Sequence, residues 1–107
     1  MKPKQPAPQG DAQLLEKTKQ KFKRPPLYVV FLYNDDFTTF EFVITILMGV
    51  FHKSLKEAVE LTHQVHDLGK GPAGVYPYDI ASTKATQVRQ LAELNEMPLR
   101  VSVEPHP

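Results

Sequence analysis

Three polar side chains, Asn34, Asp35 and Asp36, directly follow an apolar run and form the first group in this sequence that could do chemistry. Their oxygens accept hydrogen bonds, so the group can bind a cation: a metal ion, or a protein α-amino group with its three N–H donors. The same residues can instead end a strand and place negative charge at the start of a following helix. Both interpretations stay open at this point.

A second polar group, His63, His66 and Asp67, lies within a helical pattern. Residues three apart share a helix face, so the two histidines could hold a metal ion and support metal-dependent hydrolysis. The pattern lacks the glutamate of a zinc-protease motif, and no third ligand is evident. The alternative is a half-buried, hydrogen-bonded His66. We expect no metal and no cofactor.

The rest of the sequence gives little support for an enzyme. Gly69-Lys70 does not form a phosphate-binding loop, because Gln64 and Gly71 stand where that motif needs Gly and Ser or Thr. No serine or threonine has the surroundings of a nucleophile, and no acid and base flank a reacting centre. A basic run over residues 17–24 could contact RNA, but we favour a solvated linker. We therefore expect a binding protein rather than an enzyme.

The overall composition limits the fold and the setting in which these residues act. The chain has 107 residues, no cysteine and a formal net charge of +1. This length suits one domain, and the charge provides no overall field to attract nucleic acid. The lack of cysteine excludes disulfides and suits a reducing cytoplasm. No apolar run approaches the roughly 20 residues of a membrane span, and we find no targeting signal.

The composition changes near residue 26. Residues 1–26 hold five of the ten prolines, a lysine at every second position from 17 to 23, and little apolar surface. Burial there cannot offset the entropy lost on ordering, so we expect a flexible N-terminal arm. Residues 27–107 form the core domain and are numerous enough to bury one core.

The first half of the core domain predicts one strand and two helices. Residues 27–33 are β-branched and aromatic without a break, which is typical of a strand buried on both faces. Capping boxes at residues 38–41 and 54–57 predict the starts of two helices. The second helix should end near Gly69.

The second half predicts a loop at 69–74, a short strand at 75–76, a helix at 79–94 and a strand at 99–104. Asp79 serves either as the helix N-cap or as a first-turn acid. The sequence therefore predicts an α+β fold in the order β-α-α-β-α-β. We expect a three-stranded, mainly antiparallel sheet with three helices packed on one face.

Several of these motifs, taken together, resemble the ClpS family. Residues 33–43 resemble its hallmark, in which Asn-Asp-Asp, an aromatic residue and Thr are followed by Glu-Phe-Val in the next helix. The further matches, in family order, are Val65-His66 with Gly69, Ile80-Ala81 with Thr83-Lys84, and Pro98-Leu99. The resemblance covers about residues 25–104 and does not extend to the arm.

The resemblance implies a specific role, because ClpS proteins are adaptors for the ATP-dependent Clp protease. It implies binding to N-degrons, proteins whose first residue is Leu, Phe, Tyr or Trp. It also implies docking on the N-terminal domain of a ClpA-type AAA+ unfoldase, which hydrolyses the ATP. We expect a monomer with neither a nucleic acid nor a membrane as its partner.

The resemblance also implies roles for individual residues. Asn34 and His66 would accept hydrogen bonds from the substrate's α-amino group, Asp35 would hold the next backbone amide, and Thr38 would help to orient the loop. The implied pocket for the first side chain is lined by Phe40, Val43, Thr62, Val65 and Leu99. The implied unfoldase-docking residues are Asp79, Thr83 and Lys84.

Three residues depart from the usual family pattern: Thr39 replaces a common proline, and Phe40 and Thr62 stand where methionine is common. The bulkier Phe40 narrows the implied pocket and the smaller Thr62 widens it, so the ranking of first residues stays open. Two alternative functions also stay open. One is an RNA- or ribosome-associated module that uses the basic arm, and the other is the metal-dependent hydrolase.

Overall fold

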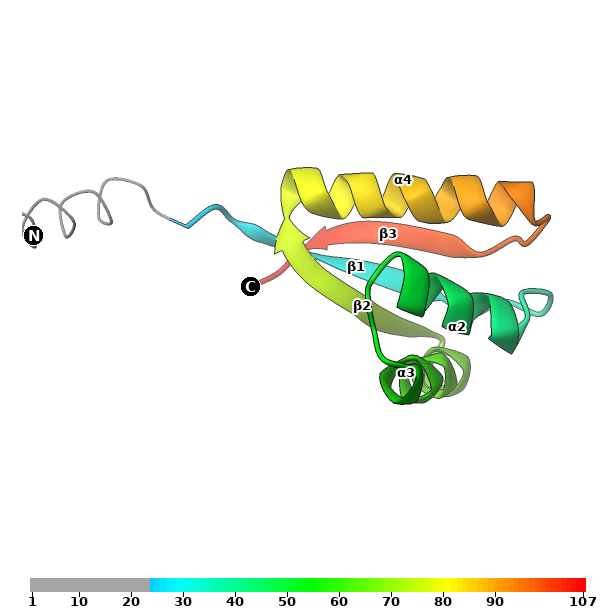
Figure 1. Ribbon diagram of the computed structural model, residues 1–107. Helices are drawn as coiled ribbons and strands as arrows, with labels where there is room; N and C mark the ends of the chain where they lie inside the picture. Colours follow the sequence, from blue (N-terminus) through cyan, green and yellow to red (C-terminus); the bar gives the residue numbers. More distant parts are fainter. Residues whose placement is uncertain (1–23) are drawn as a thin grey trace, which may run out of the picture.

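The computed structural model describes residues 24–107, which form three strands and three helices (Figure 1). Their order is β1 (Leu27–Tyr33), α2 (Phe40–Gly49), α3 (Leu55–Leu68), β2 (Lys70–Pro77), α4 (Tyr78–Leu94) and β3 (Arg100–Pro105). The predicted β-α-α-β-α-β order and α+β class are confirmed. The arm predicted for residues 1–26 lies outside the described residues except for 24–26, which form no regular element.

The sheet is antiparallel throughout, and β1 lies at its centre in the strand order β2-β1-β3. Val30 and Leu32 of β1 are completely buried, and they belong to the core under the helices. The predicted burial on both faces is only partly correct. Val29 is also buried, whereas Phe31 and Tyr33 remain partly exposed.

Strand β2 corrects the prediction of a loop at residues 69–74. Its glycines permit close packing: a Cβ on Gly71 would lie 2.9 Å from Val65 Cγ2, and one on Gly74 would clash with the Tyr76 ring. Pro72 is tolerated because β2 is an edge strand and lies at a register shift between Val30 and Phe31 of β1. The loop prediction failed because Gly and Pro signal turns locally, while pairing with β1 is a long-range effect.

The helix starts are partly as predicted. The capping box of Ser54 and Glu57 is present at α3. The first predicted box, at residues 38–41, is absent: Thr39 is the N-cap of α2, and its hydroxyl accepts from the amide of Phe42, whose side chain cannot complete a box. Helix α4 has no side-chain cap, so Asp79 is a first-turn acid rather than the N-cap.

The core lies between the sheet and the three helices, which occupy one side of the sheet in Figure 1. Helix α4 contacts all three strands, and α3 packs against β2 and α2. Helix α4 buries a stripe of residues spaced three or four apart: Ala81, Ala85, Val88 and Ala92. No helix among residues 24–107 is long and apolar enough to cross a membrane.

Candidate functional site

One small cavity collects side chains from the end of β1, the loop after it, α2 and the second half of α3. All the predicted substrate-binding and pocket residues except Leu99 line it. Its lining is Tyr33, Asn34, Asp35, Thr38, Phe40, Val43, Thr62, Val65 and His66. Segments far apart in the sequence therefore meet here.

Asp35 organises the loop between β1 and α2. One carboxylate oxygen accepts from the backbone amides of Phe37 at 2.8 Å and Thr38 at 2.7 Å, and the other accepts from the Thr38 hydroxyl. Burial raises the pKa of Asp35, but these hydrogen bonds and the Arg100 charge outweigh it, so the pKa lies below its ordinary value. Two carboxylate oxygens have about four acceptor sites, so capacity remains for a donor from a ligand.

Asn34 is held at the cavity by the end of α3. Its backbone amide donates to the Gly69 carbonyl at 2.9 Å, and its side chain is exposed. Gly69 is the C-cap of α3 and adopts a left-handed conformation with φ of 90°. His66 lies three residues before that cap, so this single backbone contact brings Asn34 and His66 to the same cavity.

His66 lies at the mouth of the cavity and is 55% exposed. Its Nδ1 lies 3.1 Å from Oδ1 of Asp67. When Nδ1 carries the proton and donates it to Asp67, Nε2 keeps its lone pair and can accept a hydrogen bond from a cationic donor. The neighbouring carboxylate thus favours the tautomer in which Nε2 is an acceptor.

Phe40 nearly closes the cavity. Its ring makes edge contacts with His63 and His66, at centroid distances of 5.3 and 5.2 Å. The remaining space is only about 10 Å³, which is at the lower limit for one water molecule. A bulky side chain can therefore enter only if lining side chains, such as that of Phe40, move.

The inner wall of the cavity is apolar. Val43 and Val65 are buried, and Thr62 is 2% exposed. The Thr62 hydroxyl donates to the Ala58 carbonyl at 2.7 Å, so its polar group is satisfied within α3. This wall therefore presents no unsatisfied polar atom to an apolar side chain.

Leu99 and Tyr33 differ from the sequence-based assignment. Leu99 is buried but lines a neighbouring groove instead of the cavity, and Tyr33 lines both. The prediction placed Tyr33 only in the strand. Its position immediately before Asn34 was the available signal, since a strand-end tyrosine has a polar tip that suits a site rim.

His63, the other member of the His63–His66 pair, contacts Phe40 and does not line the cavity. Within residues 24–107, no three His, Asp or Glu side chains gather into a group that could hold a metal ion. The hydrolase alternative therefore still lacks a third ligand in this part of the chain. The RNA alternative rests on the basic run at residues 17–24, of which 17–23 lie outside the described residues.

The predicted docking residues lie in the first half of α4. Asp79 is exposed, and its carbonyl accepts from the Thr83 hydroxyl at 2.9 Å. Lys84 is half-buried: its Nζ donates to the Val50 carbonyl at 2.7 Å and lies 5.3 Å from the Tyr76 ring centroid. Lys84 therefore ties α4 to the end of α2, in addition to any role in docking.

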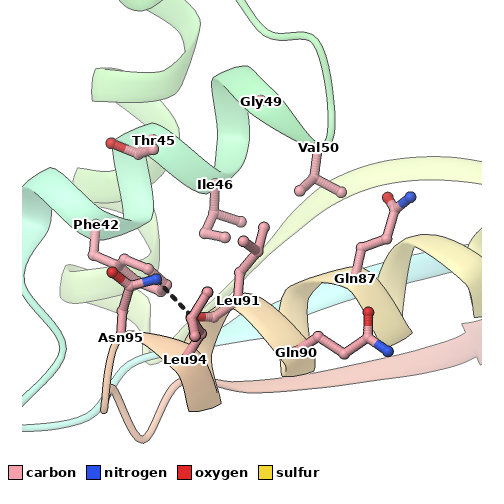
Figure 2. Close-up of a pocket in the computed structure, with 10 residues that line it drawn as sticks. All are labelled: Phe42, Thr45, Ile46, Gly49, Val50, Gln87, Gln90, Leu91, Leu94 and Asn95. Carbon is pink, nitrogen blue, oxygen red and sulfur yellow. Dashed lines mark hydrogen bonds between the residues drawn. The ribbon is translucent and has the colours of Figure 1, made fainter.

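A larger groove lies elsewhere, between α2 and α4, with a volume of about 750 Å³ (Figure 2). Its lining is Phe42, Thr45, Ile46, Gly49, Val50, Gln87, Gln90, Leu91, Leu94 and Asn95. None of these side chains is titratable, and the side-chain amide of Asn95 donates a hydrogen bond to the Leu91 carbonyl at 2.8 Å. The groove therefore lacks charged groups for recognising an ammonium ion.

Comparison with known proteins agrees with this site. Residues 23–102 match the family described as "ATP-dependent Clp protease adaptor protein ClpS". The chain belongs to the ClpS family. This is a family of adaptors for the Clp protease and is not known for catalysis.

Individual relatives agree with the family match. The ClpS adapter of Myxococcus xanthus is 55% identical over 87 residues, which is 81% of each chain. That of Clostridium acetobutylicum is 52% identical over 87 residues, which is 81% of this chain and 86% of its own. The structure of Agrobacterium tumefaciens ClpS2 bound to L-phenylalaninamide has 37% identity and a TM-score of 0.75, and covers 78% of this chain and all of its own.

Proposed function

We propose that this ClpS-family chain binds the free α-amino group and the bulky first side chain of N-degron proteins. The main support is one arrangement: the acceptors Asn34, Asp35 and His66 surround the mouth of a cavity with an apolar inner wall. The Agrobacterium relative binds L-phenylalaninamide, which combines an amino group, an aromatic side chain and an amide. Each of these three groups has a matching partner in this cavity.

The α-amino group accounts for the acceptors. It has a pKa of about 8, so at neutral pH it is an ammonium with three donors. The Asn34 side-chain oxygen and His66 Nε2 accept two of them. The Asp35 carboxylate, which the loop holds in its ionised form, accepts from the backbone amide after the first residue.

Simple magnitudes support useful affinity. Burying a Leu or Phe side chain contributes roughly 1.5–3 kcal/mol. Each hydrogen bond to a charged group adds roughly 1.5–3 kcal/mol. Two or three such bonds with the burial total roughly 4.5–12 kcal/mol before association costs of at least about 4 kcal/mol, so micromolar binding, about −8 kcal/mol, needs the upper end of these values.

Fluorescence anisotropy with short peptides tests this proposal. Peptides that begin with Leu, Phe, Tyr or Trp should bind, while a Met peptide and N-acetylated versions should bind much more weakly. Acetylation removes the charge and leaves acceptors at the mouth without donors. Equal affinity for free and acetylated peptides would contradict ammonium recognition.

Two histidine variants provide a matched comparison for the same assay. His66→Ala removes an acceptor and should weaken Leu-peptide binding about tenfold or more. His106→Ala changes an exposed histidine at the far C-terminal end and should leave the affinity unchanged. A similar effect of both variants would show that the loss is not specific to the site.

The second part of the proposal is delivery to a ClpA-type unfoldase, in the cytoplasm and by a monomeric adaptor. The exposed residues Asp79 and Thr83 present a polar helix face for the unfoldase's N-terminal domain. Family membership supports the Clp protease as the partner, with ATP and peptide hydrolysis performed there.

Asp79→Asn should weaken the adaptor–unfoldase complex in a pull-down without changing peptide affinity.

A further inference from the structure

His63 contacts the aromatic ring that closes the candidate cavity but is not part of the cavity wall. The centroid of the Phe40 ring lies 5.3 Å from that of His63 and 5.2 Å from that of His66, with interplanar angles of 84° and 68°. His66 lines the cavity together with Phe40, whereas His63 does not. The contact with Phe40 therefore connects His63 to the site without contact with a bound substrate.

The helices explain why both histidines reach one ring. His63 and His66 are three residues apart on α3, so they lie on the same face of the helix in successive turns. Helices α2 and α3 pack together, and Phe40 is the first residue of α2. Two turns of α3 therefore contact a single side chain at the start of α2.

The two histidines differ in their other partners. His66 Nδ1 lies 3.1 Å from Asp67 Oδ1, and its second ring nitrogen is the proposed acceptor for the substrate's ammonium. Among residues 24–107, His63 has no carboxylate within 4.0 Å. His63 is also exposed, so replacing it should have little effect on the stability of the fold.

Among the apolar lining side chains, Phe40 is the one best able to move. The inner wall consists of Val43, Thr62 and Val65, which are buried and β-branched and therefore stiff at χ1. Phe40 is only half-buried and belongs to the first turn of its helix. The remaining space of about 10 Å³ holds no Leu or Phe side chain, so the Phe40 ring must leave its closed position when a substrate enters.

We infer that His63 is a positioning residue that holds Phe40 over the cavity and thereby limits how fast N-degrons enter it. This inference rests on the proposed N-degron function. The contact stabilises the closed form of the free protein, and a smaller open population lowers the apparent affinity by the same fraction. One aromatic edge contact corresponds to a change in that population of about twofold to tenfold. The factor is the same for Leu, Phe, Tyr and Trp, because the contact is lost before any of them enters.

Stopped-flow anisotropy with a Leu peptide and a Phe peptide tests this inference. His63→Ala should raise the association rate about twofold to tenfold, equally for both peptides, and leave the dissociation rate unchanged. A residue that contacted the bound peptide would mainly change the dissociation rate. His63→Phe keeps an aromatic ring at this position and should keep the wild-type association rate.

Two further variants make the test specific. Gln64→Ala is the matched control, since Gln64 is the next residue of α3, is exposed and lines a separate groove. It should leave both rates unchanged. In a Phe40→Leu background, which lacks the ring, His63→Ala should also change neither rate, because the two residues act through one contact.

The outcomes separate this inference from the proposed function. An unchanged association rate in His63→Ala, a changed dissociation rate, or the same effect in the Phe40→Leu background would each overturn the inference and leave N-degron recognition standing. If the wild-type protein binds neither peptide, the proposed function fails and this inference fails with it.

Discussion

At the level of single residues, Phe40 controls access to the candidate site. Its edge contacts with His63 and His66 close the cavity, and these must break before a side chain can enter. Aromatic contacts of this kind contribute roughly 0.5–1.5 kcal/mol each. Opening therefore lowers the apparent affinity for every substrate, whatever its first residue.

Phe40→Met should tighten binding of Leu, Phe and Trp peptides about fivefold, since losing about 1 kcal/mol of closing contacts corresponds to that factor. A flexible methionine also adapts to different shapes, so the ranking should flatten. Anisotropy measures both effects. Phe42→Met is the matched control, because Phe42 is on the same helix but lines the separate α2–α4 groove. Unchanged affinities and ranking in Phe40→Met would show that this position does not control entry.

Asp35 combines loop stability with its proposed binding role. Its folded-state pKa is lowered, so its contribution to stability is complete at neutral pH and is lost as the pH falls through that pKa. The loss should occur below the ordinary aspartate pKa of about 3.9. Asp35→Asn should reduce the free energy of unfolding by about 1 kcal/mol at neutral pH and remove this part of the acid dependence.

Urea unfolding at a series of pH values measures this effect. Asp36→Asn is the control, since Asp36 is exposed and makes no side-chain hydrogen bond within the described residues. Equal acid dependence for the wild-type protein and Asp35→Asn would disprove the role of the Asp35 carboxylate in holding the loop.

At the level of elements, the end of α3 determines the geometry of the site. Gly69 adopts a φ of 90°, donates its amide to Val65 and accepts from Asn34 at 2.9 Å. A Cβ at Gly69 would meet no atom within 4 Å, so a substitution there is unfavourable only through its backbone conformation. A substitution at Gly69 therefore measures the cost of the left-handed backbone conformation without a contribution from steric clash.

Gly69→Ala should reduce the free energy of unfolding by about 1–2 kcal/mol, which is the left-handed penalty for a residue with a Cβ. It should also weaken Leu-peptide binding, because Asn34 depends on the Gly69 carbonyl. Gly49→Ala is the control: it also has open space, and it lies in α2 without a left-handed φ. Denaturation and anisotropy report the two effects, and a neutral result at Gly69 would contradict the role given to its conformation.

Lys84 joins two helices, and this affects how its docking role should be tested. Its ammonium donates to the carbonyl of Val50, the C-cap of α2, where a positive charge also interacts favourably with the negative end of the helix dipole. Lys84→Met should therefore lower the free energy of unfolding by about 1.5–3 kcal/mol. Thermal unfolding measures this, with Lys56→Met as the exposed control. A stability equal to wild type would contradict the role of the Lys84–Val50 hydrogen bond in holding α4 to α2.

At the level of the whole molecule, binding and delivery are expected to be separable. The candidate cavity is lined by residues between 33 and 66, whereas residues 1–23 are not among the described residues. Deleting residues 1–24 should keep peptide affinity unchanged but impair degradation of an N-degron reporter by the unfoldase and its protease. Loss of both activities together would contradict this division, and the full-length chain with Lys56→Gln serves as the control.

The sequence by itself determined the features that arise from local interactions. An unbroken β-branched and aromatic run located the strand at residues 27–33, and the Ser54–Glu57 capping box located the start of α3. Asn34, Asp35 and His66 were chosen by chemistry and by a family resemblance. Each of these signals depends on residues only a few positions apart, which is why it can be recognised along the chain.

Tertiary structure decided the features that depend on distant partners. Strand β2 exists because β1 supplies its hydrogen-bonding partner, despite a local composition of Gly and Pro. The amide of Asn34 reaches the carbonyl of Gly69, 35 positions further along the chain. The Phe40 ring closes the cavity only because α2 packs on α3. No local pattern contains these contacts, since they form only when the core brings separate elements together.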